Sequence, residues 1–385
     1  MCLPEVDLRR KTHVPAFLTG GQKMNIKSLL IGSAAAFAAV SGAQAADAIV
    51  AAEPEPMEYV RVCDAFGTGF FYIPGTETCL KIGGFVRFQT SFGPNQSGAS
   101  DWDAFTKAQV NFDARNDTEL GTLRSYIAFE VDSQNDIDQW GNNRTAFGIP
   151  YFDARNNADG DFHVDEAYIE LGGFKAGFFY SWWDGGINGE TDVNGNVTEF
   201  NSIAYNYDGG TWRAGISLDE LENTDVADGT LAKNLGHNNL GVAGTVGFSL
   251  GGVNLDILGG YDNGAEEGAV RAILSADLGP GTLQVLGVWA SDRSAYWNAS
   301  EWSIAASYAF KATDKLTITP AAQYFGDRNF DFAGSPDRWK VGLTVGYQIV
   351  DGLAFLGTVN YQRDDVLAGG HTDATTGFLR LQRNF

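Results

Sequence analysis

The feature of this sequence that most limits its fold is a two-residue alternation between apolar and polar side chains. In the stretch LKIGGFVRFQTSF, residues 80–92, Val86 and Phe88 fall on one side of an extended chain and Arg87 falls on the other. This stretch is about twice as long as an average strand. The same period returns many times, and no segment after residue 46 holds the 3.6-residue period of an amphipathic helix. We therefore predict an all-β protein with long strands.

Sixteen alternating segments are separated by two kinds of connection. The predicted strands lie at about 80–92, 102–115, 121–133, 163–171, 174–183, 201–208, 211–219, 239–250, 253–262, 269–279, 282–293, 301–311, 315–326, 338–349, 353–364 and 375–385. Short turns alternate with longer polar loops at about 93–101, 134–162, 184–200, 221–238, 263–268, 294–300, 327–337 and 365–374. This plan is typical of an antiparallel transmembrane β-barrel, with short periplasmic turns and long outer loops. An even number of strands also lets the barrel close.

The two faces of the predicted strands indicate two different surroundings. Charged side chains recur near the middle of many strands, opposite the apolar face, which suits a water-filled interior better than the core of a soluble sandwich. Aromatic residues near strand ends fit the girdles found at membrane interfaces: Trp102, Trp182, Trp183, Trp212, Tyr261, Trp302, Trp339 and Tyr347. A soluble propeller is a remote alternative, because no blade repeat of about 40–50 residues supports it.

The first residues indicate export rather than folded structure. Residues 24–45 place Lys27 before an apolar run and end in the small-residue motif at Ala45, which is the pattern of a cleaved secretory signal peptide. The apolar run is too short and too rich in alanine to favour a membrane anchor. Residues 1–23 precede a better start at Met24, and we interpret them as an incorrectly assigned start that takes no part in the fold.

Two cysteines, Cys63 and Cys79, follow this leader. An exported chain meets an oxidising compartment, so an even number of cysteines favours a disulfide, whereas two cysteines alone are too few ligands for a metal site. The bond would close a loop of about 15 residues and contribute roughly 3 kcal/mol in the chain-entropy model. We expect it in an N-terminal segment on the periplasmic side, residues 46–79, ahead of the barrel at residues 80–385.

Charge and motif content argue against several functions. The formal net charge of -22 does not suit nucleic-acid binding, which needs a basic face. Residues 247–251 spell G-x-S-x-G, but a nucleophile elbow needs a following helix, and here a turn and another strand follow. The histidines beyond the leader lie in or beside loops without metal-ligand spacing: His163, His237 and His371. We predict neither an enzyme nor a bound cofactor or metal.

Particular stretches of the chain resemble the alphaproteobacterial, rhizobial-type general porins. They are YVRVCDAFGTGFFYIPGTETCLKIGGFVRFQ at residues 59–89, DEAYIELGGFKAGFFYSWWD at residues 165–184, and the closing Phe385. The resemblance implies a sixteen-stranded barrel in the outer membrane of a Gram-negative bacterium, usually a homotrimer, with the third outer loop folded into the lumen. It also implies passive diffusion of small hydrophilic solutes and ions. Phe385, on an amphipathic strand, resembles the signal by which outer-membrane barrels are recognised for assembly.

Charged residues suggest where such a lumen would narrow. The predicted third loop, residues 184–200, holds four acidic residues and no basic one: Asp184, Glu190, Asp192 and Glu199. The inward faces of neighbouring strands supply a basic set: Arg87, Lys107, Arg124 and, if the last strand pairs with the first, Arg380. Rings of charge of this kind set the selectivity of a pore. We therefore predict an acidic loop facing a basic wall, with an ordinary solvated loop as the alternative.

Two further functions stay open from the sequence alone. A channel selective for a sugar or an anion would carry stacked aromatic residues along the lumen or one dominant charge at the constriction. An outer-membrane enzyme or adhesin built on a barrel would show a smaller barrel or a catalytic triad at the rim, and the sequence indicates neither.

Overall fold

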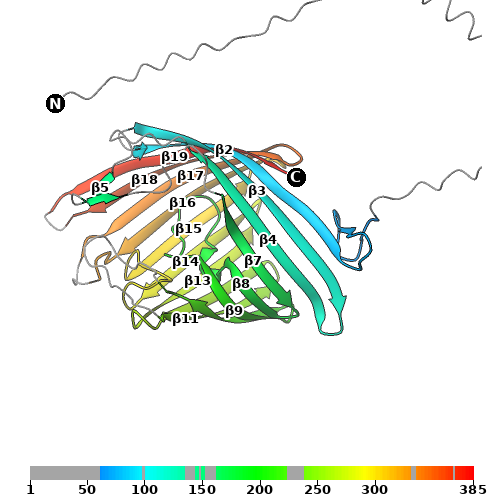
Figure 1. Cartoon of the computed structure of the whole chain (residues 1–385). Coiled ribbons are helices and arrows are strands. Elements are labelled where there is room, and N and C mark those ends of the chain that lie inside the picture. Colours follow the sequence, from blue (N-terminus) through cyan, green and yellow to red (C-terminus); the bar gives the residue numbers. More distant parts are fainter. Residues whose placement is uncertain are drawn as a thin grey trace, which may run out of the picture. The chain divides into compact units, whose positions relative to one another are not determined.

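The computed structural model describes residues 61–97, 100–134, 144–146, 149–151, 162–222, 238–330, 335–366 and 369–385. The predicted leader, residues 1–45, lies outside these ranges. The described chain forms a 17-stranded antiparallel sheet in which one strand, β1 (Phe71–Tyr72), is a short addition to β2. The other sixteen strands close into a barrel, because β19 pairs with β2 (Figure 1). No helix in the described ranges is long and apolar enough to cross a membrane.

The sixteen strands of the barrel correspond one to one with the predicted strands. They are β2 (Cys79–Ser97), β3 (Ser100–Thr118), β4 (Gly121–Gln134), β7 (Phe162–Leu171), β8 (Phe174–Tyr180), β9 (Glu199–Asp208), β10 (Trp212–Glu220), β11 (Leu240–Leu250), β12 (Val253–Asp262), β13 (Glu267–Leu278), β14 (Gly281–Ala290), β15 (Trp302–Lys311), β16 (Leu316–Gly326), β17 (Arg338–Val350), β18 (Leu353–Asp365) and β19 (His371–Asn384). A separate pair, β5 (Arg144–Ala146) and β6 (Ile149–Tyr151), lies within the predicted loop 134–162. The predicted loop 93–101 is wrong, because β2 and β3 continue through most of it.

The two-residue alternation separates the outer and inner faces of this wall. Val86 and Phe88 are 48% and 50% exposed, whereas the intervening inner face includes Gln89 at 8%. The outer face carries exposed apolar residues around the barrel, for example Ile127, Val246, Ile304 and Leu343. Such a continuous apolar surface is the one that a bilayer covers. The exposed side chains of Trp102, Trp212, Tyr261, Trp302 and Tyr347 fit the predicted girdles.

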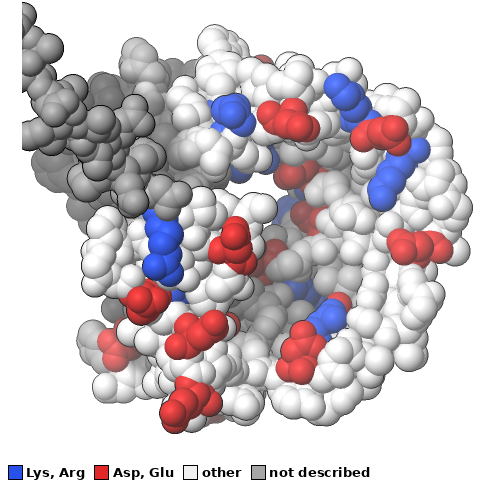
Figure 2. Space-filling view, turned by 90° about the vertical axis from the view of Figure 1, so that its right-hand side faces the viewer, with Lys and Arg blue, Asp and Glu red and all other residues white. Residues whose placement is uncertain are grey.

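One end of the barrel carries the short turns and the other carries the long connections. The turn between β3 and β4 points to the right in Figure 1, and Figure 2 looks onto that side of the molecule. An opening lies between the walls there, and both basic and acidic side chains are visible around it and within it. The barrel is therefore hollow for part of its width.

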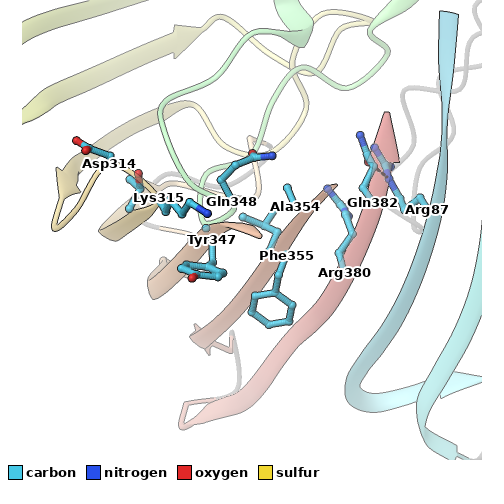
Figure 3. A pocket seen from close by; sticks show the side chains of 12 residues that line it. Arg87, Asp314, Lys315, Tyr347, Gln348, Ala354, Phe355, Arg380 and Gln382 are labelled. Carbon is cyan, nitrogen blue, oxygen red and sulfur yellow. Dashed lines mark hydrogen bonds between the residues drawn. The ribbon is translucent and has the colours of Figure 1, made fainter. Parts of the chain in front are cut away.

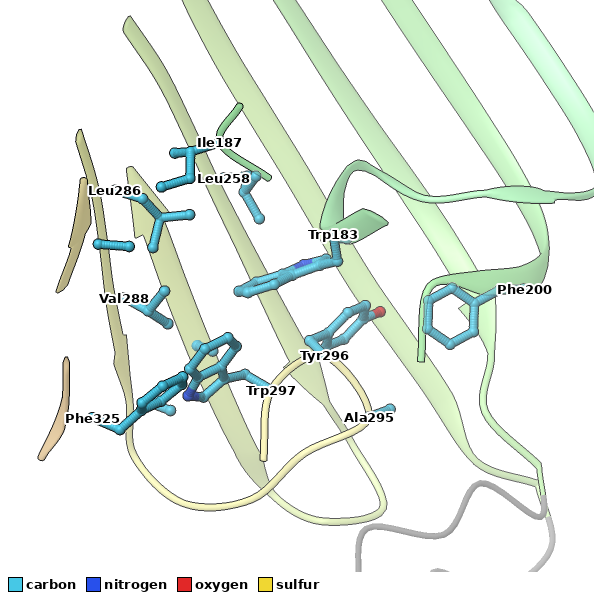
Figure 4. Close-up of a cluster of buried hydrophobic side chains, with 14 of the residues drawn as sticks. Trp183, Ile187, Phe200, Leu258, Leu286, Val288, Ala295, Tyr296, Trp297 and Phe325 are labelled. Atoms are coloured by element: carbon cyan, nitrogen blue, oxygen red, sulfur yellow. The ribbon is translucent and has the colours of Figure 1, made fainter. Parts of the chain in front are cut away.

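Two long connections turn inward and fill the rest of that width. Residues 181–198 join β8 to β9 and contain the short 3-10 helix η1 (Trp182–Asp184), and residues 291–301 join β14 to β15. The two segments pair through backbone hydrogen bonds from Asn196 N to Tyr296 O (3.0 Å) and from Val197 N to Ala295 O (2.9 Å). Trp183 and Trp297 are fully buried within the resulting apolar cluster (Figure 4).

This inner cluster corrects two sequence predictions. The predicted strand 174–183 ends at Tyr180, and Trp183 belongs to the interior rather than to a membrane girdle; Trp182 packs against the same cluster. Residues 294–300 were predicted as an outer polar loop, yet they are mostly buried inside the barrel. The physical reason is that a large aromatic ring gains more by burial against an apolar wall than by standing in water.

The cluster fits because the wall beneath it is built from small residues. A Cβ at Gly241 would collide with the Tyr296 hydroxyl, and one at Gly260 would lie 2.5 Å from the Tyr296 ring. The Tyr296 hydroxyl donates to Asp219 Oδ2 at 2.7 Å. Burial and the neighbouring Asp219 raise the pKa of Tyr296, so the hydroxyl keeps its proton as a donor.

The predicted disulfide joins the N-terminal segment to the first residue of β2. Cys63 and Cys79 are bonded, with their Cα atoms 5.9 Å apart. Both cysteines are buried beside Phe70, and Phe66 and Tyr72 pack against them. This small cluster ties the described part of the segment to the start of the barrel wall.

Candidate functional site

The third outer connection, residues 181–198, crosses the lumen and is bound to the wall on the far side. Four wall side chains hydrogen-bond its backbone: Gln284 of β14, Gln323 of β16, Thr344 of β17 and Asn360 of β18. Glu190 is held twice, because its N–H donates to Thr344 Oγ1 (3.0 Å) and its carbonyl accepts from Asn360 Nδ2 (3.1 Å). The predicted inward fold of the third loop is therefore confirmed.

A buried arginine holds the start of this loop. Arg271 of β13 is 0% exposed and donates to the carbonyl oxygens of Trp182 (2.8 Å) and Trp183 (3.1 Å). Its guanidinium also lies 5.1 Å from the centre of the Trp183 ring, a cation–π contact. Ser181 caps the 3-10 helix by accepting from Trp183 N at 3.2 Å. Sequence reasoning did not single out Arg271, because nothing in the local pattern of β13 indicates a loop contact.

The four acidic residues of the predicted loop lie in different places. Glu190 Oε1 faces Arg380 Nη1 at 3.9 Å. Asp192 accepts from the backbone N–H of Ile187 at 2.9 Å, and burial raises the pKa of its carboxyl above the ordinary 3.8. Asp184 ends the 3-10 helix, and Glu199 is the first residue of β9 in the wall. Within the described ranges, Glu190 is the acidic residue of this set that pairs with a basic residue of the wall.

Two of the four predicted basic residues lie together on the paired strands β2 and β19. Arg87 of β2 donates through Nε to Gln382 Oε1, and Arg380 of β19 donates through Nε to Gln89 Oε1, each at 2.7 Å. Neutral glutamines thus fix both guanidinium groups without cancelling their charge. Lys315 joins them around a cavity of about 550 Å³ (Figure 3).

The other two predicted basic residues are neutralised within the wall. Lys107 forms an ion pair with Glu130 and lies 3.7 Å from Asp132. Arg124 pairs with Asp113 at 3.0 Å and with Glu170 at 3.3 Å. Neither group is paired with the third loop in the described structure.

The acidic partners on this wall were missed by sequence reasoning. They occupy the same inward faces as the predicted basic residues: Asp113, Glu130, Asp132 and Glu170. A signal for them was present in the alternation itself, since residues of equal parity share a face. The register between strands was needed to see which charges meet.

The sequence is similar to a known protein family and to several bacterial outer membrane proteins. A model of the porin subfamily matches residues 47–379. The chain is 53% identical over 372 residues to a putative outer membrane protein of Sinorhizobium fredii, covering 94% of this chain and 100% of that protein. It is 48% identical over 353 residues to outer membrane protein IIIA of Rhizobium leguminosarum bv. viciae (88% and 90% covered). It is 34% identical over 397 residues to porin Omp2a of Brucella suis (94% and 100% covered).

Solved structures show a similar fold at low sequence identity. The outer membrane channel DcaP of Acinetobacter baumannii aligns with a TM-score of 0.58 at 13% identity, covering 82% of this chain and 99% of that one. The trimer form of OmpT of Vibrio cholerae aligns with a TM-score of 0.57 at 12% identity, covering 80% and 100%. At these identities the likeness supports the architecture alone.

Proposed function

From the premise that this chain belongs to the porin subfamily and is a porin of the Gram-negative outer membrane, we propose that it is a general diffusion pore. Small hydrophilic solutes and ions pass through its water-filled lumen without a bound cofactor. Membership of this family indicates a channel rather than an enzyme. The lumen narrows where the third loop approaches the wall formed by β19 and β2.

The observation that carries this proposal is the position of Glu190. Two hydrogen bonds fix its backbone to β17 and β18, and its carboxylate lies 3.9 Å from Arg380. Arg87 stands on the neighbouring strand, hydrogen-bonded to Gln382 of β19. Opposite charges across a water-filled gap create a transverse electric field. Polar solutes align in this field, whereas an apolar solute must displace the water that the field orders.

This assignment refines the basic wall predicted from the sequence. Arg87 and Arg380 carry the net positive charge at the narrowing, whereas Lys107 and Arg124 are paired with wall carboxylates and add no net positive charge there. Asp184, Asp192 and Glu199 act behind Glu190 as a source of negative potential rather than as direct partners. The narrowing is therefore one acidic group facing two arginines.

Reversal potentials in a salt gradient across a planar bilayer test the proposal. In the Arg87→Gln/Arg380→Gln variant we expect the ratio of cation to anion permeability to rise. A unit charge about 4 Å away is worth about 1 kcal/mol in water, which is about a fivefold change. The matched control is Arg363→Gln, because Arg363 lies on the opposite face of β18 from Asn360 and pairs there with Asp373.

The control should keep the selectivity of the unmodified protein. An unchanged permeability ratio in the double variant would contradict the assignment of the narrowing. A conductance that saturates steeply with one solute would contradict the general-diffusion function itself.

A selective anion channel is a second candidate, and one observation favours it. Three cationic side chains border the cavity in Figure 3, Arg87, Lys315 and Arg380, against the single acidic residue Asp314. This arrangement could concentrate anions even though the whole chain is acidic. Current saturation with phosphate or organic anions, but not with chloride, would favour this candidate over the general pore.

We further propose that three copies assemble through their outer faces. The support is the exposed apolar surface of the barrel and the trimer form of the structurally similar OmpT. Native mass spectrometry of the detergent-solubilised protein tests the assembly. A mass of one chain at concentrations where the pore conducts would contradict it.

A further inference from the structure

Three potential metal ligands meet on the inner face of the wall, away from the narrowing. Glu130 lies on β4, and His163 and Asp165 lie on β7. Glu130 and His163 are direct partners in the register of the two strands. A β-bulge opposite Ala128 and Phe129 makes Asp165 the extra residue of β7. Bulges often re-aim a side chain in this way, and here the result is three ligands in one place.

The distances suit a small cation. One ligand atom from each of the three residues lies within 4.8 Å of the others, and His163 Nε2 is 3.7 Å from Glu130 Oε1. Bond lengths of about 2.0–2.2 Å to zinc place tetrahedral ligands roughly 3.4 Å apart, so the ligand atoms need to close by at most about 1.4 Å. Glu130 and Asp165 are each 6% exposed, whereas the His163 side chain is 42% exposed. An ion can therefore enter from the lumen past the imidazole.

Hydrogen-bonding neighbours hold both carboxylates in position. Asp165 accepts from Gln109 Nε2 (2.7 Å) and from the Tyr180 hydroxyl (3.0 Å). Each carboxylate oxygen has a second lone pair, so these bonds orient the group without exhausting it. Lys107 pairs with Glu130 and lies near Asp132. Two ligand carboxylates and Asp132 against one lysine leave the surroundings negative, which favours a dication.

We propose that Glu130, His163 and Asp165 form a binding site for a divalent transition-metal ion of the Zn²⁺ class. Water completes the coordination, because the protein supplies three ligands. The imidazole nitrogen sets the class of metal, since it suits Zn²⁺, Co²⁺ and Ni²⁺ better than Ca²⁺ or Mg²⁺, which prefer oxygen ligands alone. The site goes beyond the diffusion function and does not depend on it.

Isothermal titration calorimetry on the full-length, detergent-solubilised protein measures the site directly, first with ZnCl₂ and then with CaCl₂. We expect one Zn²⁺ per chain and markedly weaker binding of Ca²⁺. His163→Gln should weaken Zn²⁺ binding by at least about tenfold, and Asp165→Asn should weaken it similarly. His371→Gln is the matched control, because His371 lies 3.6 Å from Asp373 as a histidine–carboxylate pair and belongs to no three-ligand group among the described residues. This control should bind Zn²⁺ like the unmodified protein.

A second measurement does not rely on any variant. Co²⁺ bound to a mixed nitrogen and oxygen set gives visible absorption bands that Zn²⁺ displaces, whereas Co²⁺ attracted only by surface charge keeps the spectrum of the hydrated ion. Heat-modifiable migration on a gel checks that each variant is folded. The proposal is overturned if no Zn²⁺ binds, if Ca²⁺ binds as tightly as Zn²⁺, or if His163→Gln and Asp165→Asn retain full affinity. Because calorimetry measures binding whether or not the pore conducts, failure here is distinguishable from failure of the diffusion function.

Discussion

The two halves of the barrel interior are made from strands of the same alternating pattern, but their inner faces meet different neighbours. From β9 to β16 the inner face presents mainly small and apolar residues, and the loops 181–198 and 291–301 pack against it. From β19 through β2 to β8 the inner face presents arginine, lysine, aspartate and glutamate, and the lumen there stays open. One half therefore resembles a protein core, and the other half resembles a charged surface turned inward.

Polar groups are treated differently in the two halves. In the packed half, Asp219 accepts from the Tyr296 hydroxyl (2.7 Å), and Asp262 accepts from Ala295 N (3.0 Å), so loop donors satisfy the carboxylates. In the open half, Asp113 pairs with Arg115 on its own strand and with Arg124 on the neighbouring strand. The difference teaches that the size of the inner-face residues decides which half accepts a loop, while charge decides what stays solvated.

The largest expected effect comes from removing Trp183, a fully buried side chain of the packed half. Trp183→Ala leaves a cavity at the centre of the packed half, and we expect a loss of about 3–5 kcal/mol in the free energy that holds the cluster together. The third loop should then leave the wall, and single-channel conductance should rise. Trp212→Ala, at an exposed position on the outer face, is the control and should not change conductance. Equal conductance in both variants would break the comparison.

Glycine substitutions test whether small residues make room for the loops. Gly260→Ala places a Cβ 2.5 Å from the Tyr296 ring, so the loop 291–301 must shift at a cost of about 1–3 kcal/mol. Gly346→Ala, on β17 beside the cavity of about 550 Å³ and outside the packed half, meets no atom closer than 3.7 Å and should be tolerated. Limited proteolysis of the loop measures the difference. If both variants resist protease equally, residue size does not separate the two halves.

Charge-neutral changes sharpen the description of the open half. Lys107→Met/Glu130→Gln removes one ion pair without altering net charge, so we expect little change in the reversal potential. Arg87→Gln/Arg380→Gln removes two positive charges that face the single carboxylate of Glu190, and it should shift the reversal potential, with a smaller effect in 1 M salt, where the Debye length is about 3 Å. A chelator in the buffer keeps metal binding from affecting the first variant. Equal shifts in the two variants would show that the ion pairs do not neutralise the wall.

The smallest expected effect concerns pH. The pKa of Asp192 is raised by burial, so this carboxyl takes up a proton at a higher pH in the folded protein than in the unfolded chain. Its charge therefore destabilises the docked loop above the raised pKa. That penalty disappears as the pH falls through the raised pKa towards 3.8. Arg271 and Lys340 lower the pKa of Asp192, but burial outweighs them. We expect Asp192→Asn to remove one acid-dependent component of ion selectivity, measured between pH 7 and 4. A pH profile identical to that of the unmodified protein would exclude this role.

Much of the wall could be predicted from the sequence, because period-2 alternation is a local signal. The strands around Val86 and Phe88 and the disulfide of Cys63 and Cys79 follow from it and from cysteine count. Ion pairs between neighbouring strands could not be predicted, because they depend on the register in which the strands pair. Nothing local to Lys107 indicates that Glu130 lies opposite its strand within reach.

Residues in loops were the least predictable. Trp183 stands at the end of an alternating run and so resembles an interfacial aromatic, yet it packs inward because Arg271 and the small residues opposite receive it. The adjacent aromatic residues Tyr296 and Trp297 are unusual for a solvated loop, and they indicate that this loop is buried. The signal peptide and the incorrectly assigned start lie outside the described residues and stay predictions, as does the role of Phe385 in assembly.

The hydrogen bonds of Arg87 and Arg380 have a consequence for how the protein matures. Each arginine is fixed by a glutamine on the other strand of the β2–β19 seam, residues that are 295 and 291 positions apart in the chain. Backbone bonds between Gly84 and Phe385 close the same seam. Before β2 and β19 pair, both strands present unpaired edges that favour aggregation. In that state neither Arg87 nor Arg380 has its glutamine partner in place. Closure of the barrel and positioning of the two arginines therefore occur together. A barrel that has not closed would lack the charged narrowing that gives ion selectivity.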